Sequence, residues 1–328
     1  MLAEPERRTL FVDAMKGVAI LLMIFLHARL SGMQWGRFIT VFHMPLFFLL
    51  SGYLYKVRSF HEVVKRNTSK IIFPYVVTCL MIFVVKWLCF QEPNWWMSII
   101  WGNSQKLCFM NTNLSVGPLW FLTAYFCAMV YMAVIDKIRR EIYQWCILIT
   151  FFSISLIWAK YAYSLLPFGV ITGVGGAVFI YIGRYLKSRP YFFQEQKYLF
   201  MGIFMWAVCV AFGRLAMNVH EYRLFLIEIV GAVYGTYLCY VFVNSFKQDS
   251  ALFKFLCYIG SNSLAIICIH SIDRVLGISS SLAEIIVDNP GKDVLVFQLD
   301  VIFKFCFVLL LFLLFRFTPP LRRLYRIM

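Results

Sequence analysis

Long apolar runs, separated by short polar stretches, organise this chain. Ten such runs recur, and most have the length that a helix needs to cross about 30 Å of hydrocarbon. They cover residues 12–30, 38–55, 71–90, 118–135, 143–159, 165–183, 198–213, 224–246, 253–272 and 295–315. The runs at 143–159 and 198–213 are the shortest. The pattern predicts an all-α polytopic membrane protein with about ten transmembrane helices, built as one domain over residues 1–328.

Composition supports a membrane protein. Hydrophobic residues make up 62% of the 328 residues, charged residues only 14%, and the mean hydropathy is +0.77. Asp13 and Lys16 interrupt the first run and no small-residue cleavage site follows it, so we expect a retained helix rather than a signal peptide. The ten cysteines are scattered and form no CxxC pair, which favours small buried side chains over a disulfide or a metal site.

The basic residues follow the loops. The net charge of +15 could indicate a nucleic-acid partner, but with the N-terminus in the cytoplasm 20 Lys and Arg fall on inner stretches and 8 on outer ones. This bias is the positive-inside rule. We therefore reject nucleic acid as a partner and expect a multi-pass protein of the plasma membrane with both termini cytoplasmic.

Four ionisable side chains within the apolar runs are candidates for chemistry. Lys16 and His27 are 11 residues apart, which in a helix places them on one face and about 16–17 Å apart along the axis. The alternation of spans puts His27, His43 and His270 at similar depth in the outer half of the membrane. A single histidine in an apolar helix is usually a hydrogen-bonded core residue, but three at one depth favour a catalytic base.

Other polar features have simpler explanations. The longest outer loop, 91–117, sets Trp95 among amide side chains that suit a sugar, although tryptophan also gathers at membrane interfaces and interface anchoring is the stronger interpretation. Lys86 and Lys304 are expected to extend toward an interface.

Four motifs, taken together, resemble the acyltransferase-3 family of integral membrane acyltransferases, in particular its stand-alone bacterial members. They are Asp13…Lys16-Gly17…His27, Phe42-His43-Met44-Pro45 through Ser51-Gly52-Tyr53, Lys70 to Pro74-Tyr75 followed by Gly117-Pro118-Leu119-Trp120, and Gly260-Ser261-Asn262-Ser263-Leu264 running to His270. Two positions depart from the family pattern. Lys16 replaces the usual Arg, and Ile267 stands where Tyr is common.

The resemblance implies transfer of an acetyl or other short acyl group from acyl-CoA, a co-substrate, to a hydroxyl of a cell-surface glycan or lipid-linked acceptor. It implies no metal and no permanently bound cofactor. His27 would be the catalytic residue, as general base in preference to an acyl-His relay, with His43 or Asn262 supporting the oxyanion. The supporting or donor-path residues would be Lys16, Asp13, His43, Trp120, Asn262, Ser263 and His270. The candidate contacts to CoA phosphates are Lys56, Arg58, Lys65, Arg66 and Lys70.

Two other classes compete with an enzyme. A multi-span transporter or flippase of a glycan or lipid-linked sugar would often show internal repeats with broken helices in matching positions, and neither is evident. A ligand-gated or sensor protein is the third class. The sequence leaves open the acceptor, the acyl group and the oligomeric state.

Overall fold

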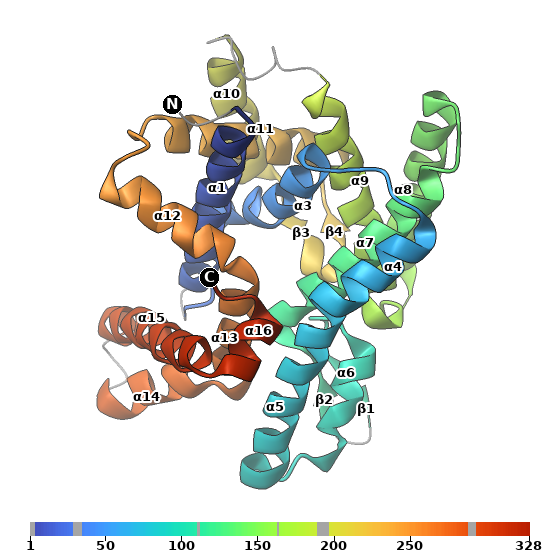
Figure 1. Cartoon of the computed structure of the whole chain (residues 1–328). Helices are drawn as coiled ribbons and strands as arrows, with labels where there is room; N and C mark the ends of the chain where they lie inside the picture. Colours follow the sequence, from blue (N-terminus) through green and yellow to red (C-terminus); the bar gives the residue numbers. More distant parts are fainter. Residues whose placement is uncertain (1–3, 29–34, 110–111, 163, 189–196, 288–292) are drawn as a thin grey trace.

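The chain is almost entirely helical. The computed structural model describes residues 4–28, 35–109, 112–162, 164–188, 197–287 and 293–328 (Figure 1). Its α-helices are α1 (Glu4–Leu26), α2 (Trp35–Thr40), α3 (His43–Tyr53), α4 (Phe60–Asn67), α5 (Phe73–Phe90), α6 (Met97–Trp101), α7 (Trp120–Ile135), α8 (Glu141–Tyr161), α9 (Val170–Lys187), α10 (Lys197–Phe212), α11 (Leu226–Asn244), α12 (Ala251–Ser261), α13 (Ser263–Leu276), α14 (Ile278–Val287), α15 (Asp293–Phe317) and α16 (Pro319–Tyr325). A π-helical turn, η1 (Thr68–Ile72), joins α4 to α5, and the 3₁₀ turns are η2 (Pro93–Trp96), η3 (Gly117–Leu119), η4 (Pro167–Gly169) and η6 (Met217–Val219). Two antiparallel hairpins pair β1 (Leu107–Phe109) with β2 (Thr112–Leu114) and β3 (Leu215–Ala216) with β4 (Glu221–Tyr222).

Seven helical segments in the described part of the chain are long and apolar enough to cross a membrane. They are Thr9–Leu26, Phe60–Phe90, Gly117–Ile135, Glu141–Tyr161, Pro167–Lys187, Leu226–Asn244 and Val294–Phe317. The pair α12–α13, bent by 72° at Asn262, makes an eighth if it is one span. The protein is therefore an all-α, multi-pass membrane protein, as predicted. The run at 143–159, one of the two shortest, forms a full-length span.

The predicted number of ten spans is not confirmed among the described residues. The run at 198–213 forms only the 16-residue α10, and the run at 38–55 forms α2 and the 11-residue α3. Pro45 explains the second case, because it has no N–H for a bond to the carbonyl four residues earlier, so a helix can begin near it but not run through it. Nine of the eleven α3 residues are buried, so protein rather than lipid surrounds this helix.

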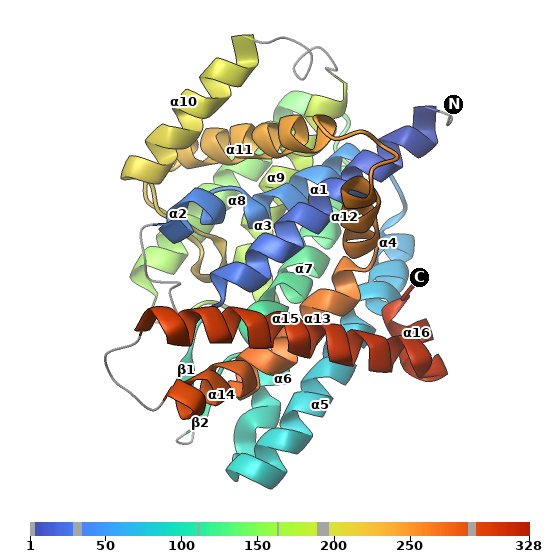
Figure 2. The ribbon, with the colours of Figure 1, turned by 90° about the vertical axis from the view of Figure 1, so that its left-hand side faces the viewer.

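Two helix pairs pack at backbone contact through glycine. A side chain at Gly17 would overlap the backbone of Leu256, and one at Gly260 would overlap the backbone of Asp13, so α1 and α12 cross without room for a Cβ. Gly52 on α3 meets α9 in the same way. Small residues at such crossings let helices approach closely in lipid. In Figure 2, α15 lies across α13 and α14, with which it packs.

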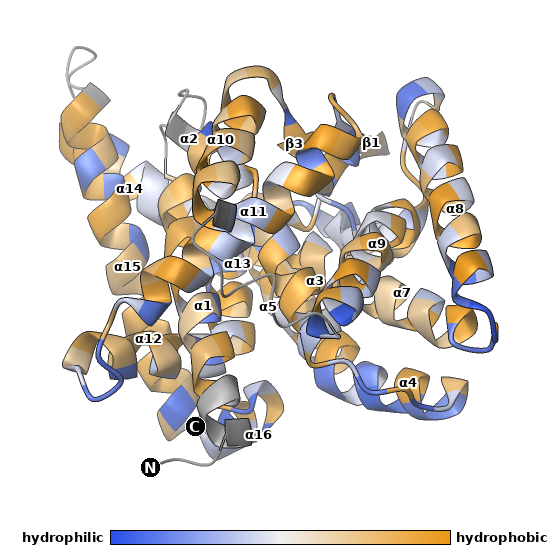
Figure 3. Ribbon diagram, turned by 90° about the horizontal axis from the view of Figure 1, so that it is seen from above, coloured by the Kyte–Doolittle hydropathy of each residue, from blue (hydrophilic) through white to orange (hydrophobic). Residues whose placement is uncertain are grey.

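One end of the bundle collects the basic loops and the C-terminus. The backbone N–H of Met328 donates to the Asn262 side chain at 3.0 Å, and the Lys137 ammonium lies 5.4 Å from the centre of the Phe60 ring, at the start of α4. Figure 3 shows that hydrophilic stretches concentrate on α4 and the connecting loops, while most helical ribbon is hydrophobic. We call this the basic end, and the opposite one, where α1 finishes just before His27, the histidine end.

Candidate functional site

Two cavities in the described part of the bundle contain predicted site residues. The larger, of about 660 Å³, is at the histidine end and is lined by Met23, Leu26, His27, Thr40, His43, Met44, Lys86, Glu92, Trp95, Ser104, Lys106, Asn113, Ser115, Gly117, Pro118, Trp120, Leu215, Ala216, Met217, Asn218, Ile267, Arg274 and Val275. The smaller, of about 260 Å³, lies toward the basic end and is lined by Val12, Lys16, Ile20, Phe47, Leu50, Ser51, Leu54, Ile71, Phe121, Leu122, Tyr125, Ser263, Leu264 and Ile267. Four helices, α1, α3, α7 and α13, contribute to both.

One face of α1 passes from the smaller cavity to the larger. Val12, Lys16 and Ile20 line the first, and Met23 and His27 line the second. Their spacings of four, four, three and four residues keep them on one side of a helix with 3.6 residues per turn. The predicted common face of Lys16 and His27 is present, but the two side chains border different cavities.

A hydrophobic wall separates the cavities. Ile267 on α13 lines both of them. Phe47 and Phe121, whose ring centroids are 5.5 Å apart, lie on the smaller-cavity side, and Trp120 lies on the other side against Phe121. Ile267, at the position where the resemblance leads one to expect Tyr, is therefore the residue shared by both chambers.

His27 and His43 both line the larger cavity and both use Nδ1 to bond a backbone carbonyl. Nδ1 of His27 lies 2.7 Å from the Met23 carbonyl oxygen, and Nδ1 of His43 lies 3.0 Å from that of Ile39. Because a carbonyl only accepts, both neutral rings carry their proton on Nδ1 and hold a lone pair on Nε2. Each Nε2 is therefore a base. A neutral His43 in this tautomer has no ring N–H to offer an oxyanion.

His270 and Asn262 lie outside both cavities. The His270 ring is fully buried with its centroid 5.2 Å from that of His27, and neither of its nitrogens has a hydrogen-bond partner among the described residues. Asn262 sits at the α12–α13 bend, where its amide donates to the Tyr258 carbonyl at 2.8 Å and its oxygen accepts from Met328. His270 can orient His27, whereas Asn262 caps the bend and its geometry does not support the expected oxyanion role.

Lys16 both forms an ion pair and lines the smaller cavity. Its ammonium is 2.6 Å from the Asp13 carboxylate one turn earlier, and the side chain also lines the smaller cavity with Ser263. Both side chains of the pair are partly exposed, so the ion pair leaves Lys16 able to reach a ligand in that cavity.

The five predicted phosphate-contact residues lie on and before α4 and η1, at the basic end; they are Lys56, Arg58, Lys65, Arg66 and Lys70. Arg58 pairs with Glu62 at 2.8 Å, and Ile71, directly after Lys70, lines the smaller cavity. The basic segment therefore borders the chamber that contains Lys16.

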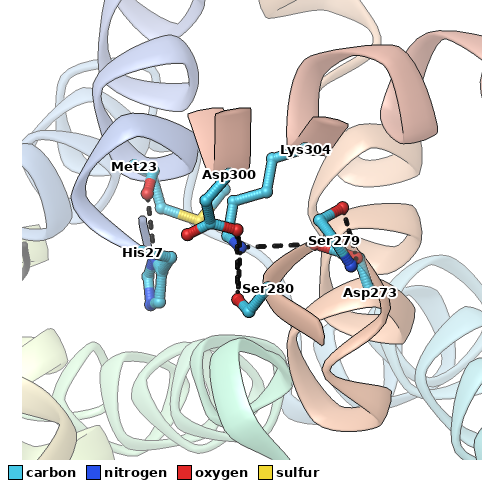
Figure 4. Close-up of polar contacts among 7 residues, drawn as sticks. All are labelled: Met23, His27, Asp273, Ser279, Ser280, Asp300 and Lys304. Atoms are coloured by element: carbon cyan, nitrogen blue, oxygen red, sulfur yellow. Dashed lines mark hydrogen bonds and ion pairs between the residues drawn. The ribbon is translucent and has the colours of Figure 1, made fainter. Parts of the chain in front are cut away.

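Lys304 does not extend to an interface as expected. It is 1% exposed on α15, forms an ion pair with Asp300 one turn earlier, and donates to Ser280 at 2.9 Å (Figure 4). Its ammonium also lies 3.9 Å from the Asp273 carboxylate, which accepts from Ser279. This buried network joins α13, α14 and α15. No local sequence pattern indicates this network, because the partners come from different helices.

The β3–β4 hairpin is a wall of the larger cavity that the sequence analysis also missed. Leu215 to Asn218 face the cavity, and the next residues anchor the hairpin: Nε2 of His220 lies 2.8 Å from the Ser155 hydroxyl on α8. Burial lowers the pKa of His220 to about 3. A polar Asn-Val-His between two apolar runs was the available signal.

The loop 91–117, whose residues suit a sugar, contributes side chains to the larger cavity. Trp95 is buried and lines the larger cavity together with Asn113, whereas Trp96 is exposed. The loop therefore supplies both an aromatic ring and an amide to the chamber that contains His27.

A comparison with family models matches nearly the whole chain. The family described as an acyltransferase domain, the acyltransferase-3 type, matches residues 9–315, which include every residue of both cavities. Neither a curated protein nor a solved structure matches the chain.

Proposed function

The chain belongs to the acyltransferase-3 family, and on that premise we propose that it moves an acetyl or other short acyl group from acyl-CoA to a hydroxyl of a cell-surface glycan or lipid-linked acceptor. The observation that carries the proposal is the pair of cavities that meet at Ile267, with a histidine base in one and a lysine in the other.

The donor is assigned to the basic end. Coenzyme A is cytosolic and carries phosphates, and the five basic residues from Lys56 to Lys70 can bind them. The acyl-pantetheine arm then enters the smaller cavity past Lys16, and its thioester reaches the wall at Ile267. This assignment places the basic end and both termini in the cytoplasm of a plasma membrane, in agreement with the bias of basic residues.

His27 performs the proton transfer. Its Nε2 removes the proton of the acceptor hydroxyl as the oxygen attacks the thioester carbonyl carbon. The tetrahedral intermediate collapses with cleavage of the carbon–sulfur bond, and the proton passes from His27 to the leaving thiolate. The products are the acylated acceptor and coenzyme A with a free thiol. The Met23 carbonyl and the His270 ring keep His27 oriented through this sequence.

Release of free thiol from acetyl-CoA by the purified protein tests the proposal. We expect His27→Ala to lower turnover by about two to four orders of magnitude, since a general base contributes that much. His61→Ala, which removes an exposed histidine outside both cavities, should retain wild-type turnover. Wild-type turnover in His27→Ala would remove His27 from the mechanism. A transporter, the alternative class, would move its substrate without thiol release.

A further inference from the structure

The larger cavity carries an excess of positive charge. Lys86, Lys106 and Arg274 line it, while Glu92 is the one carboxylate among its described lining residues. Glu92 is 3.2 Å from the Lys86 ammonium and so neutralises that cation. Lys106 and Arg274 have no carboxylate partner among the described residues, so two positive charges face the chamber that contains His27.

These charges converge from separate parts of the fold. Lys106 directly precedes β1 in the loop between α6 and α7, and Arg274 lies in the last turn of α13. Both side chains are exposed, and both line this one concave site. A cleft lined by one sign of charge concentrates ligands of the opposite sign.

We infer that the acceptor carries an anionic group, a carboxylate or a phosphate, on the sugar that is acylated. The inference rests on the proposed function and names the class of its acceptor. The guanidinium of Arg274 offers paired donors that match either anion, and Lys106 adds a point charge. Asn113, Asn218 and Trp95 supply the amides and the aromatic face for the uncharged part of the sugar.

Coenzyme A is the other anionic ligand of the reaction, and the experiment must separate the two. Purified full-length protein in nanodiscs is given acetyl-CoA with one of three acceptors: methyl glucuronoside, glucose 1-phosphate or the neutral methyl glucoside. Thiol release gives kcat/KM for each acceptor, and KM for acetyl-CoA is measured in parallel.

We expect at least one anionic acceptor to exceed methyl glucoside about tenfold or more in kcat/KM, the effect of a charge-assisted hydrogen bond. Arg274→Gln and Lys106→Gln should bring that ratio toward one with KM for acetyl-CoA unchanged, and Arg274→Lys should keep most of it. Arg223→Gln, which removes an exposed cation outside both cavities, should not change it.

Equal use of charged and neutral acceptors would overturn the inference, as would variants that raise only the KM for acetyl-CoA. Absence of thiol release with all three would instead count against the proposed function. The charge inference is then decided by calorimetric binding of methyl glucuronoside against methyl glucoside. Tighter binding of the glucuronoside that Arg274→Gln abolishes supports it, and equal binding refutes it.

Discussion

His27 and His43 owe their shared tautomer to backbone carbonyls of the helices that precede them, α1 for His27 and α2 for His43. Each ring bonds the backbone carbonyl four residues earlier, at Met23 and Ile39. A backbone carbonyl thus has the role here that the carboxylate has in a Ser-His-Asp triad, where the carboxylate holds the imidazole proton on Nδ1. Because the orienting group is backbone, substitution of neighbouring side chains should leave the basic Nε2 in place.

Lys16 is predicted to act on the donor. Lys16→Ala should raise the KM for acetyl-CoA more than the KM for the acceptor, since Lys16 lines the smaller cavity and His27 the larger. Lys16→Arg should retain most activity because it keeps the charge, with some loss where the geometry differs. Kinetics per correctly inserted molecule are the measurement. An unchanged KM for acetyl-CoA together with lower insertion would leave Lys16 only its ion pair with Asp13.

His220 is predicted to make stability depend on pH. Burial lowers its pKa from 6.5 to about 3, so between these values the unfolded chain takes up a proton that the folded chain does not. The free energy of unfolding therefore falls as pH drops below about 6.5, by about 2 kcal/mol at pH 5. Thermal unfolding of His220→Gln should show a smaller decrease between pH 7 and pH 5 than the wild type. His61→Gln, at an exposed site, should match the wild type, and equal slopes in all three proteins would contradict the prediction.

At the residue scale, the sequence predicts the features that depend on a single helix. The spacing of Lys16 and His27 is set by helical periodicity, so their common face could be predicted. The surroundings of Lys304 and Asn262 could not, because the groups that pair with Lys304 come from α13, α14 and α15, and Asn262 accepts from the distant C-terminus. Such contacts depend on tertiary packing that no local pattern encodes.

Among the elements, the α1–α12 crossing positions residues of the smaller cavity. Gly17 and Gly260 bring the two helices into backbone contact, and the same helices carry Lys16 and lead to Ser263. The small cavity therefore depends on a crossing with no space for one additional methyl group.

Gly260→Ala is predicted to destabilise the protein by about 1–3 kcal/mol, because its Cβ would overlap the Asp13 backbone, which cannot rotate away. Thermal unfolding in detergent is the measurement. Gly202→Ala on α10 is the matched control, since its Cβ would meet side chains rather than backbone: Tyr234 at 3.2 Å, Tyr237 at 3.6 Å and Leu238 at 3.8 Å. Equal unfolding temperatures for the two variants would show that the crossing tolerates a wider separation.

The sequence predicted helical elements well and their lengths less well. Apolar runs identify helices, but hydropathy does not show which helices lipid surrounds. α3 is short because protein encloses it and Pro45 limits its start. The 72° bend at Asn262 likewise lies within one continuous apolar run.

In the whole molecule, the basic residues of the loops lie in two groups, one at each end of the bundle. The segment 56–70, Lys137 and the C-terminus meet at the basic end, and Lys106 and Arg274 meet at the histidine end. This is the grouping that the count of basic residues predicts.

Reporters inserted after His61 or Gln105, or fused to Met328, test which end of the molecule faces the cytoplasm. His61 and Met328 should report a cytoplasmic position and Gln105 an external one, because 20 basic residues fall on the inner side and 8 on the outer side. Asn289, another expected external position, lies outside the described residues. A cytoplasmic signal from Gln105 would contradict both the topology and the assignment of donor and acceptor to their cavities.

The wall of Ile267, Phe47 and Phe121 also bears on the permeability of the membrane. A continuous water-filled passage between the two chambers would let protons and ions leak down their gradients and dissipate the membrane potential. Apolar side chains between the chambers exclude the hydrated ion, for which loss of water is very costly. An acyl carbonyl a few atoms long has no such cost. Under the proposed function, this wall would let the acyl group pass between the two chambers without opening a path for ions across the bilayer.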